Sequence, residues 1–116
     1  MAEQSAGWQI DSYLETRAGH LTVDGLDTVT LIEQYGTPLY VFSEKRIAGH
    51  VRDLRRAVEA VHPRVKLCYA SKANSNMAVL AAVRRAGGDI EVNSGGELHK
   101  ARTVGFQNEG LSSYLT

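Results

Sequence analysis

One lysine lies where a predicted strand passes into a predicted helix, within residues 69–76 (YASKANSN). Lys72 directly follows the β-favouring run at residues 65–71. In α/β folds, ligands and catalytic groups lie at the carboxyl ends of the strands. A neutral lysine amine can form a Schiff base with a carbonyl compound, and low-polarity surroundings favour the neutral form. The other interpretation is a solvated lysine on a loop, and periodicity alone does not choose between the two.

The neighbours of Lys72 are expected on alternating faces of that strand. Side chains alternate along a strand, so Cys68, Ala70 and Lys72 should share one face, and Tyr69 should pack beneath the helices. We interpret Cys68 as an inert core residue. No metal site is predicted, because metal-ligand spacing is lacking among the four histidines, which are His20, His50, His62 and His99.

The elements that would position Lys72 repeat three times between residues 37 and 106. Strands are predicted at 39–42, 65–71 and 90–93, and each is followed by an amphipathic or capped helix. Such alternation predicts an α/β fold with parallel strands. A closed (β/α)8 barrel takes about 250 residues, so three units form either a small open sheet or part of a barrel.

Local signals define several helix ends and one buried face. Ser94 and Glu97 have the spacing of a capping box. The helix after the first strand carries an apolar stripe at helical period, made of Ile47, Val51, Leu54, Val58 and Val61. The sequence therefore predicts that this helix packs against a core.

Residues 1–36 precede the repeating pattern. Residues 1–19 are polar and lack a clear period, so we interpret them as a loosely ordered arm. A short strand at 21–23 should close at the turn Asp24-Gly25, and a helix should run from an N-cap at Asp27 to a stop at Gly36.

Composition limits the classes of partner. The 13 Lys+Arg balance the 13 Asp+Glu, which argues against nucleic acid or a membrane surface as a partner. The single cysteine excludes an intrachain disulfide. No secretory signal or apolar span is visible, so a cytoplasmic location is predicted.

Three segments resemble, in order and spacing, the fold-type III pyridoxal-phosphate-dependent decarboxylases, the family of the ornithine, diaminopimelate and arginine decarboxylases. Residues 69–76, with Val79-Leu80, resemble the segment that carries the cofactor lysine. Residues 36–41 (GTPLYV) resemble the first barrel strand, and residues 94–98 (SGGEL) resemble the start of the third helix. The similarity covers residues 19–106 and implies the first three βα units of an alanine-racemase-like (β/α)8 barrel.

The resemblance also implies chemistry. It implies a Schiff base between Lys72 and pyridoxal 5'-phosphate, with Ala70 lining the cofactor pocket. Glu91 falls near the cofactor where relatives usually carry Asp, and the other interpretation of Glu91 is a strand-end charge paired with a cation. The implied reaction is decarboxylation of an amino-acid substrate, meso-diaminopimelate to L-lysine and CO2, by a homodimer. The alternatives are an alanine-racemase-like enzyme, which would racemise rather than release CO2, and a non-catalytic barrel fragment.

The resemblance stops after Phe106. Residues 107–116 do not resemble the family's fourth strand, so they are interpreted as a divergent tail that leaves the third strand with an open edge. The family's phosphate-binding loop and the partner of the pyridine nitrogen come later still. We therefore expect residues 1–116 alone to bind the cofactor weakly and to show no turnover.

Overall fold

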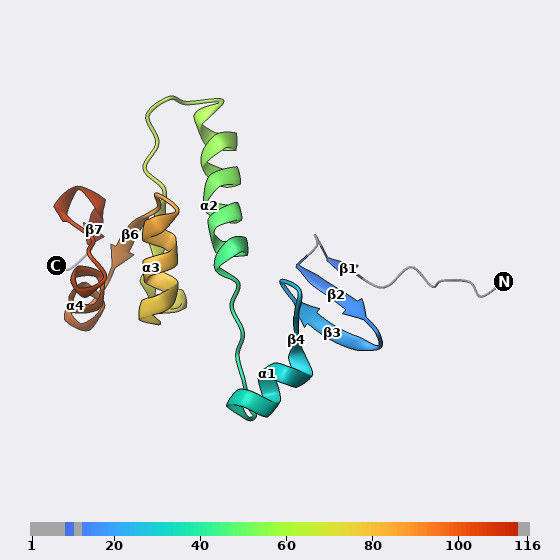
Figure 1. The fold of residues 1–116 in the computed structure, drawn as a ribbon. Helices are drawn as coiled ribbons and strands as arrows, with labels where there is room; N and C mark the ends of the chain where they lie inside the picture. The colour runs from blue at the N-terminus through green and yellow to red at the C-terminus, as the bar shows by residue number, and fades with distance from the viewer. Residues whose placement is uncertain (1–8, 11–12, 114–116) are drawn as a thin grey trace. The chain divides into compact units, whose positions relative to one another are not determined.

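The computed structural model describes residues 9–10 and 13–113 (Figure 1). It divides the chain into two compact units, residues 1–43 and residues 44–116. The first contains an antiparallel sheet and a helix, and the second alternates parallel strands with helices. The domain boundaries at residues 36/37 and 106/107 stay predictions.

The first unit contains an antiparallel sheet. Its strands, in the order β1-β2-β3-β4, are β1 (Gln9–Ile10), β2 (Leu14–Arg17), β3 (His20–Val23) and β4 (Leu26–Asp27). Ala18-Gly19 joins β2 to β3 and Asp24-Gly25 joins β3 to β4, and all four residues have positive φ. That backbone is typical of type I′ hairpin turns, whose twist matches that of the strands.

The turn at Asp24-Gly25 is confirmed, but the loosely ordered arm is wrong for residues 9–10 and 14–17. These residues form β1 and β2, which pair with each other, and β2 also pairs with β3. The side chains of β2 are half-buried or exposed, so they leave little apolar alternation in the sequence. Main-chain pairing and the Ala18-Gly19 turn specify these strands. Residues 1–8 and 11–12 of the predicted arm lie outside the described residues.

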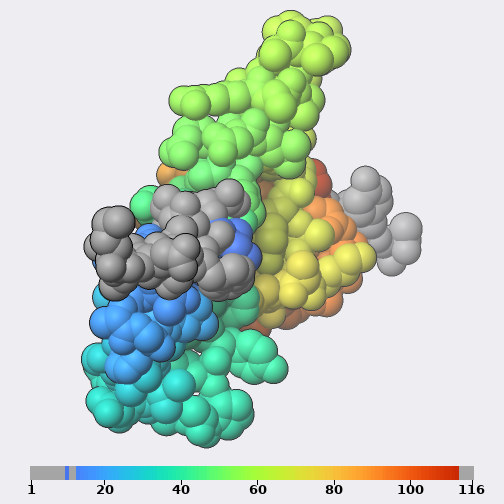
Figure 2. All heavy atoms as spheres, turned by 90° about the vertical axis from the view of Figure 1, so that its right-hand side faces the viewer, coloured from blue at the N-terminus to red at the C-terminus, as the bar shows by residue number. Residues whose placement is uncertain are grey.

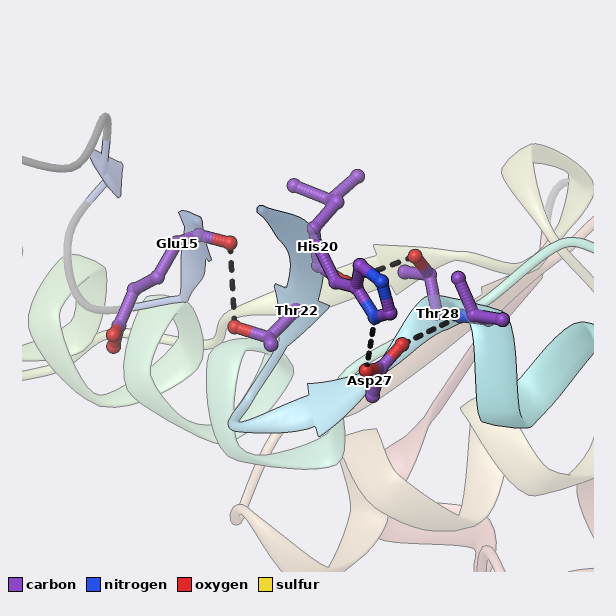
Figure 3. Close-up of polar contacts among 7 residues, drawn as sticks. Glu15, His20, Thr22, Asp27 and Thr28 are labelled. Carbon is purple, nitrogen blue, oxygen red and sulfur yellow. Dashed lines mark hydrogen bonds and ion pairs between the residues drawn. The ribbon is translucent and has the colours of Figure 1, made fainter. Parts of the chain in front are cut away.

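Asp27 connects β3 and β4 to helix α1 (Thr28–Tyr35) (Figure 3). Its carboxylate accepts hydrogen bonds from the backbone N–H of Val29 and from Nδ1 of His20, both at 2.7 Å. The Thr28 hydroxyl donates to the Leu21 carbonyl at 2.9 Å. The predicted N-cap at Asp27 is therefore confirmed, and Gly36 ends the helix as predicted.

The contacts of Asp27 predict a pH dependence. Hydrogen bonds from His20 and from the Val29 N–H lower the pKa of Asp27 below its ordinary value of 3.8. The folded state thus favours the carboxylate, so its stabilisation is complete above pH 3.8 and is lost as the pH falls through the lower folded-state pKa. We expect an NMR titration of the Asp27 carboxyl to give a midpoint below 3.8, which His20→Ala should raise.

Asp27→Asn is the control for this titration, because asparagine still caps a helix but carries no charge. In this variant the free energy of unfolding, measured in urea, should fall less between pH 5 and pH 3 than in the unaltered chain. An Asp27 midpoint at or above 3.8 would contradict the prediction.

The second unit begins with α2 (Glu44–Glu59) and continues with a parallel sheet in the order β5-β6-β7. The strands are β5 (Cys68–Ala70), β6 (Asp89–Val92) and β7 (Leu111–Ser113). Helix α3 (Met77–Arg85) follows β5, and α4 (Gly95–Thr103) follows β6. The described part of this unit also contains two short 3-10 turns, η1 (Ser71–Ala73) and η2 (Asn108–Gly110). The predicted α/β alternation with parallel strands is confirmed for residues 68–113.

One face of this sheet forms the core of the second unit. The fully or nearly fully buried core residues come from α3, β6, α4 and the segment after it; they are Leu80, Val83, Ile90, Val92, Ala101 and Phe106. Tyr69 of β5 and Leu111 of β7 pack against them. Because side chains alternate, the opposite face carries Cys68 and Ala70 of β5 and Glu91 of β6. Tyr69 therefore lies on the helix side, as predicted.

Residues 39–42 do not form the predicted strand. No described strand pairs with them, and Tyr40 is 85% exposed. Instead Leu39 and Val41 line a hollow of about 160 Å³ beside α1, together with Thr28, Leu31 and Ile32. Residues 39–42 have the apolar composition of a strand, but a strand also needs main-chain hydrogen bonds to a neighbouring strand. The sequence pattern does not reveal whether such a neighbour exists.

The predicted open edge of the third strand is wrong. β7 pairs with β6 in parallel, with Ile90 opposite Leu111 and Glu91 opposite Ser112. The described part of β7 is three residues long and has a single large apolar residue, Leu111. Such a short strand carries no readable periodicity, and its position is set by the main-chain hydrogen bonds to β6.

The apolar stripe of α2 is buried only in part. Ile47, in the first half of the helix, packs against the core, whereas Leu54 is 52% exposed. The end of α2 and the loop after it project from the rest of the second unit (light green in Figure 2), and Val61 is 87% exposed.

In the described part of the chain, no helix combines the length and apolar character needed to cross a bilayer.

Candidate cofactor site

Lys72 lies in η1, directly after the carboxyl end of β5. Its side chain is exposed, and none of the described residues offers it a hydrogen bond or an ion pair. The amine is therefore accessible to a dissolved carbonyl compound. In this structure the Lys72 side chain is therefore not enclosed by low-polarity walls.

A set of local hydrogen bonds shapes the turn between β5 and α3. The Tyr69 hydroxyl donates to the Asn74 carbonyl at 3.1 Å, and the Asn76 N–H donates to Oδ1 of Asn74 at 3.0 Å. Asn76 is the N-cap of α3, since its Oδ1 accepts from the Ala78 N–H at 2.9 Å. Burial raises the pKa of Tyr69, so its hydroxyl keeps its proton and remains a donor. Lys72 thus belongs to a defined turn.

Ala70 and Glu91 lie next to each other at this end of the sheet. They are paired residues of β5 and β6, and paired residues of parallel strands point to the same face. Both are half-buried. The small Ala70 side chain thus lies opposite a carboxylate, that of Glu91, on the neighbouring strand. No described residue forms an ion pair with Glu91, so the strand-end interpretation that pairs it with a cation gains no support.

Ser71, the residue before Lys72, has an unsatisfied hydroxyl. It is fully buried, and its Oγ has no hydrogen-bond partner among the described residues. A buried polar group without a partner costs about 1–3 kcal/mol. We expect Ser71→Ala to leave the free energy of unfolding unchanged or to raise it by up to about 1 kcal/mol, measured in urea. A loss of more than about 1 kcal/mol would show that the hydroxyl has a partner.

An apolar hollow of about 330 Å³ lies between α2 and β5 and reaches Ala70 and Ala73. It is lined by His50, Val51, Leu54, Leu67, Cys68, Tyr69, Ala70, Ala73, Val83 and Gly88. Lys72 is not in the lining, and the lining contains no lysine or arginine. Apart from the imidazole of His50 and the hydroxyl of Tyr69, the lining side chains offer no strong hydrogen-bond donor, so the hollow is a poor match for a phosphate group.

At the start of α4, one of the two hydrogen bonds of the predicted capping box forms as expected, and the other has a different donor. The Glu97 N–H donates to Oγ of Ser94 at 3.2 Å, as expected. The Glu97 carboxylate reaches past the N-cap and accepts from the Asn93 N–H at 2.6 Å.

In residues 9–10 and 13–113, no group of three His, Cys, Asp or Glu side chains is placed to bind a metal.

Residues 45–112 match a family model described as "Pyridoxal-dependent decarboxylase, pyridoxal binding domain". The chain belongs to this family. The match runs past Phe106 into β7, so the predicted end of the resemblance at residue 106 lies too early.

Two curated relatives of this family member are diaminopimelate decarboxylases. The protein from Methanothermobacter thermautotrophicus is 43% identical over 93 residues, which is 80% of this chain and 22% of the relative. The Bacillus subtilis protein is 36% identical over 97 residues, which is 84% of this chain and 22% of the relative. The chain thus spans about a fifth of the length of these relatives.

A solved structure has a similar fold. Diaminopimelate decarboxylase from M. jannaschii superposes with a TM-score of 0.77 at 30% identity, covering 89% of this chain and 25% of that one. A second structure of that enzyme, with the same TM-score, is a co-complex with L-lysine. The pyridoxal binding domain of the family is therefore supported by sequence and by fold.

Two features of this site are not visible in the sequence. One is the unsatisfied hydroxyl of Ser71, and the other is a hydrogen bond from Nζ of Lys100 on α4 to Oγ of Ser75 at 2.9 Å. The second joins residues 25 positions apart. No local spacing could reveal it, because it depends on how α3 and α4 pack.

Proposed function

We propose that this chain forms the cofactor-lysine part of a pyridoxal-phosphate-dependent amino-acid decarboxylase, and that its substrate is meso-diaminopimelate. The observation that carries the proposal is Lys72. It is an accessible amine in a defined turn at the carboxyl end of a parallel strand, within a pyridoxal binding domain. The diaminopimelate decarboxylases among the relatives support the choice of substrate.

The residues at this end of the sheet fit the cofactor in their chemistry. Lys72 would hold it covalently, since a lysine Nζ forms a C=N bond with an aldehyde carbon as one water leaves. When bound, pyridoxal phosphate supplies an electron sink for the carbanion that loss of CO2 leaves behind. Ala70 would leave space for the ring, and Glu91 would offer a hydrogen-bond acceptor that is one methylene longer than the Asp of relatives.

The proposal includes the fold and the assembly. We assign the segment from α2 to β7 to the first βα units of a (β/α)8 barrel, supported by the TM-score of 0.77 to the M. jannaschii enzyme. In such a barrel the carboxyl ends of the strands form the active-site face, which is the edge where Lys72 lies. A homodimer is part of the same proposal.

A trapping experiment tests the assignment of Lys72. The chain contains four lysines, which are Lys45, Lys66, Lys72 and Lys100. The purified chain is incubated with pyridoxal 5'-phosphate, reduced with sodium borohydride and digested, and the labelled peptides are quantified by mass spectrometry. We expect the label to concentrate on Lys72. An even spread over the four lysines would remove the basis of the proposal.

A further inference from the structure

The turn that carries Lys72 is fixed at most of its positions by its own neighbours. The Asn74 carbonyl and side chain are bonded to Tyr69 and Asn76, and Asn76 caps α3. Ser75 has its contact elsewhere, because its hydroxyl bonds to Nζ of Lys100 at 2.9 Å. The Lys100 side chain thus links α4 to this turn.

The position of Lys100 makes this contact a constraint on the turn. Lys100 lies in the second half of α4, one residue before Ala101, which is fully buried in the core. Its own side chain is half-buried, so its stem lies against the protein and its ammonium group ends on Ser75. An ammonium group donating to a hydroxyl is a charge-assisted hydrogen bond, which is stronger than a neutral one. Because α4 is packed in the core, this hydrogen bond restricts the movement of Ser75, three residues after Lys72.

We infer that Lys100 is a positioning residue for Lys72. It acts through Ser75, and it keeps the segment 71–76 in the conformation that presents the Lys72 amine at the edge of the sheet. This inference rests on the proposed function of Lys72. Without Lys100 the turn should sample more conformations, so fewer Lys72 amines should be placed for reaction at any moment.

The first measurement does not involve the cofactor. Backbone ¹⁵N relaxation should show greater mobility at residues 72–75 in Lys100→Ala than in the unaltered chain, with no change in β6. Lys100→Arg should restore the lower mobility, because a guanidinium group also donates to a hydroxyl. Unchanged mobility at residues 72–75 in Lys100→Ala overturns the inference, whatever the fate of the proposed function.

The second measurement is the rate at which pyridoxal 5'-phosphate labels Lys72 under borohydride, divided by the rate at Lys45 in the same sample. Lys100→Ala and Ser75→Ala should each lower this ratio by about threefold to tenfold, the effect of losing one hydrogen bond. The double variant should lower it no further, because both changes remove the same contact. Lys66→Ala is the matched control, since Nζ of Lys66 contacts the Leu111 carbonyl at 3.4 Å, away from the turn, and should leave the ratio unchanged.

The two failures are distinguishable. If Lys72 is not favoured over Lys45 in the unaltered chain, the proposed function fails, and the relaxation data alone decide whether Lys100 holds the turn. If Lys72 is favoured but the ratio is the same in Lys100→Ala, or if the effects of Lys100→Ala and Ser75→Ala add, the positioning role is wrong.

Discussion

Lys72→Ala should remove nearly all of the label that pyridoxal 5'-phosphate and borohydride leave on this chain. The other lysines lack its combination of features. Lys66 and Lys100 have hydrogen-bond partners, and Lys45 lies on the exposed first turn of α2 rather than at a strand end. Arginine cannot replace Lys72, because a guanidinium group stays protonated and is not a nucleophile at neutral pH. Lys72→Arg should therefore lose the label while keeping the charge.

Lys45→Ala is the matched control for this prediction, because it removes an exposed lysine from the same chain. It should leave the label on Lys72 unchanged. Circular dichroism of all three variants should match that of the unaltered chain, since the exposed Lys72 side chain makes no contact that the fold needs. Label that persists in Lys72→Ala at the original level would show that another amine reacts with the cofactor.

Leu80→Ala should have the largest effect on stability. Leu80 lies in the middle of α3, is fully buried, and belongs to the cluster that covers the core face of β6. Removing a fully buried leucine side chain loses its transfer free energy and leaves a cavity, which together cost about 2–5 kcal/mol. Urea unfolding of the whole chain, followed by circular dichroism, measures this loss.

Leu54→Ala makes the same chemical change at a half-exposed site on α2. Since about half of that side chain is already in water, the expected loss is about 1 kcal/mol or less. A larger loss for Leu54→Ala than for Leu80→Ala would mean that the core of the second unit lies on the α2 side of the molecule. Comparing these two variants therefore tests where the core lies, because both remove the same leucine side chain.

The parts of the fold that the sequence predicted depend on short-range contacts. Asp27 and Ser94 cap helices whose first N–H groups lie two or three residues away. The turn at Asp24-Gly25 needs only the positive φ of its own two residues. Such features form within a few residues, so residue type and spacing are sufficient to predict them.

The errors concern strands, because a strand exists only with a partner. Residues 39–42 have the composition of a buried strand but no ladder, whereas β7 has little of that composition and pairs with β6. The pairing of β7 with β6 joins residues far apart in the chain and leaves no local periodicity by which it can be recognised. β2 pairs with neighbours close in the chain, but its half-buried and exposed side chains leave little apolar alternation.

The sequence by itself determined which residue is the candidate for the chemistry. The motif at residues 69–76 identifies Lys72 as this residue. Because the motif lies between a strand and a helix, Lys72 lies at the carboxyl end of the sheet. Only the tertiary structure decided that this amine is exposed, that Glu91 lies beside Ala70, and that Lys100 reaches the turn from α4. The physical reason is that exposure and contact depend on packing between elements far apart in the chain, whereas residue type and order are written in the sequence.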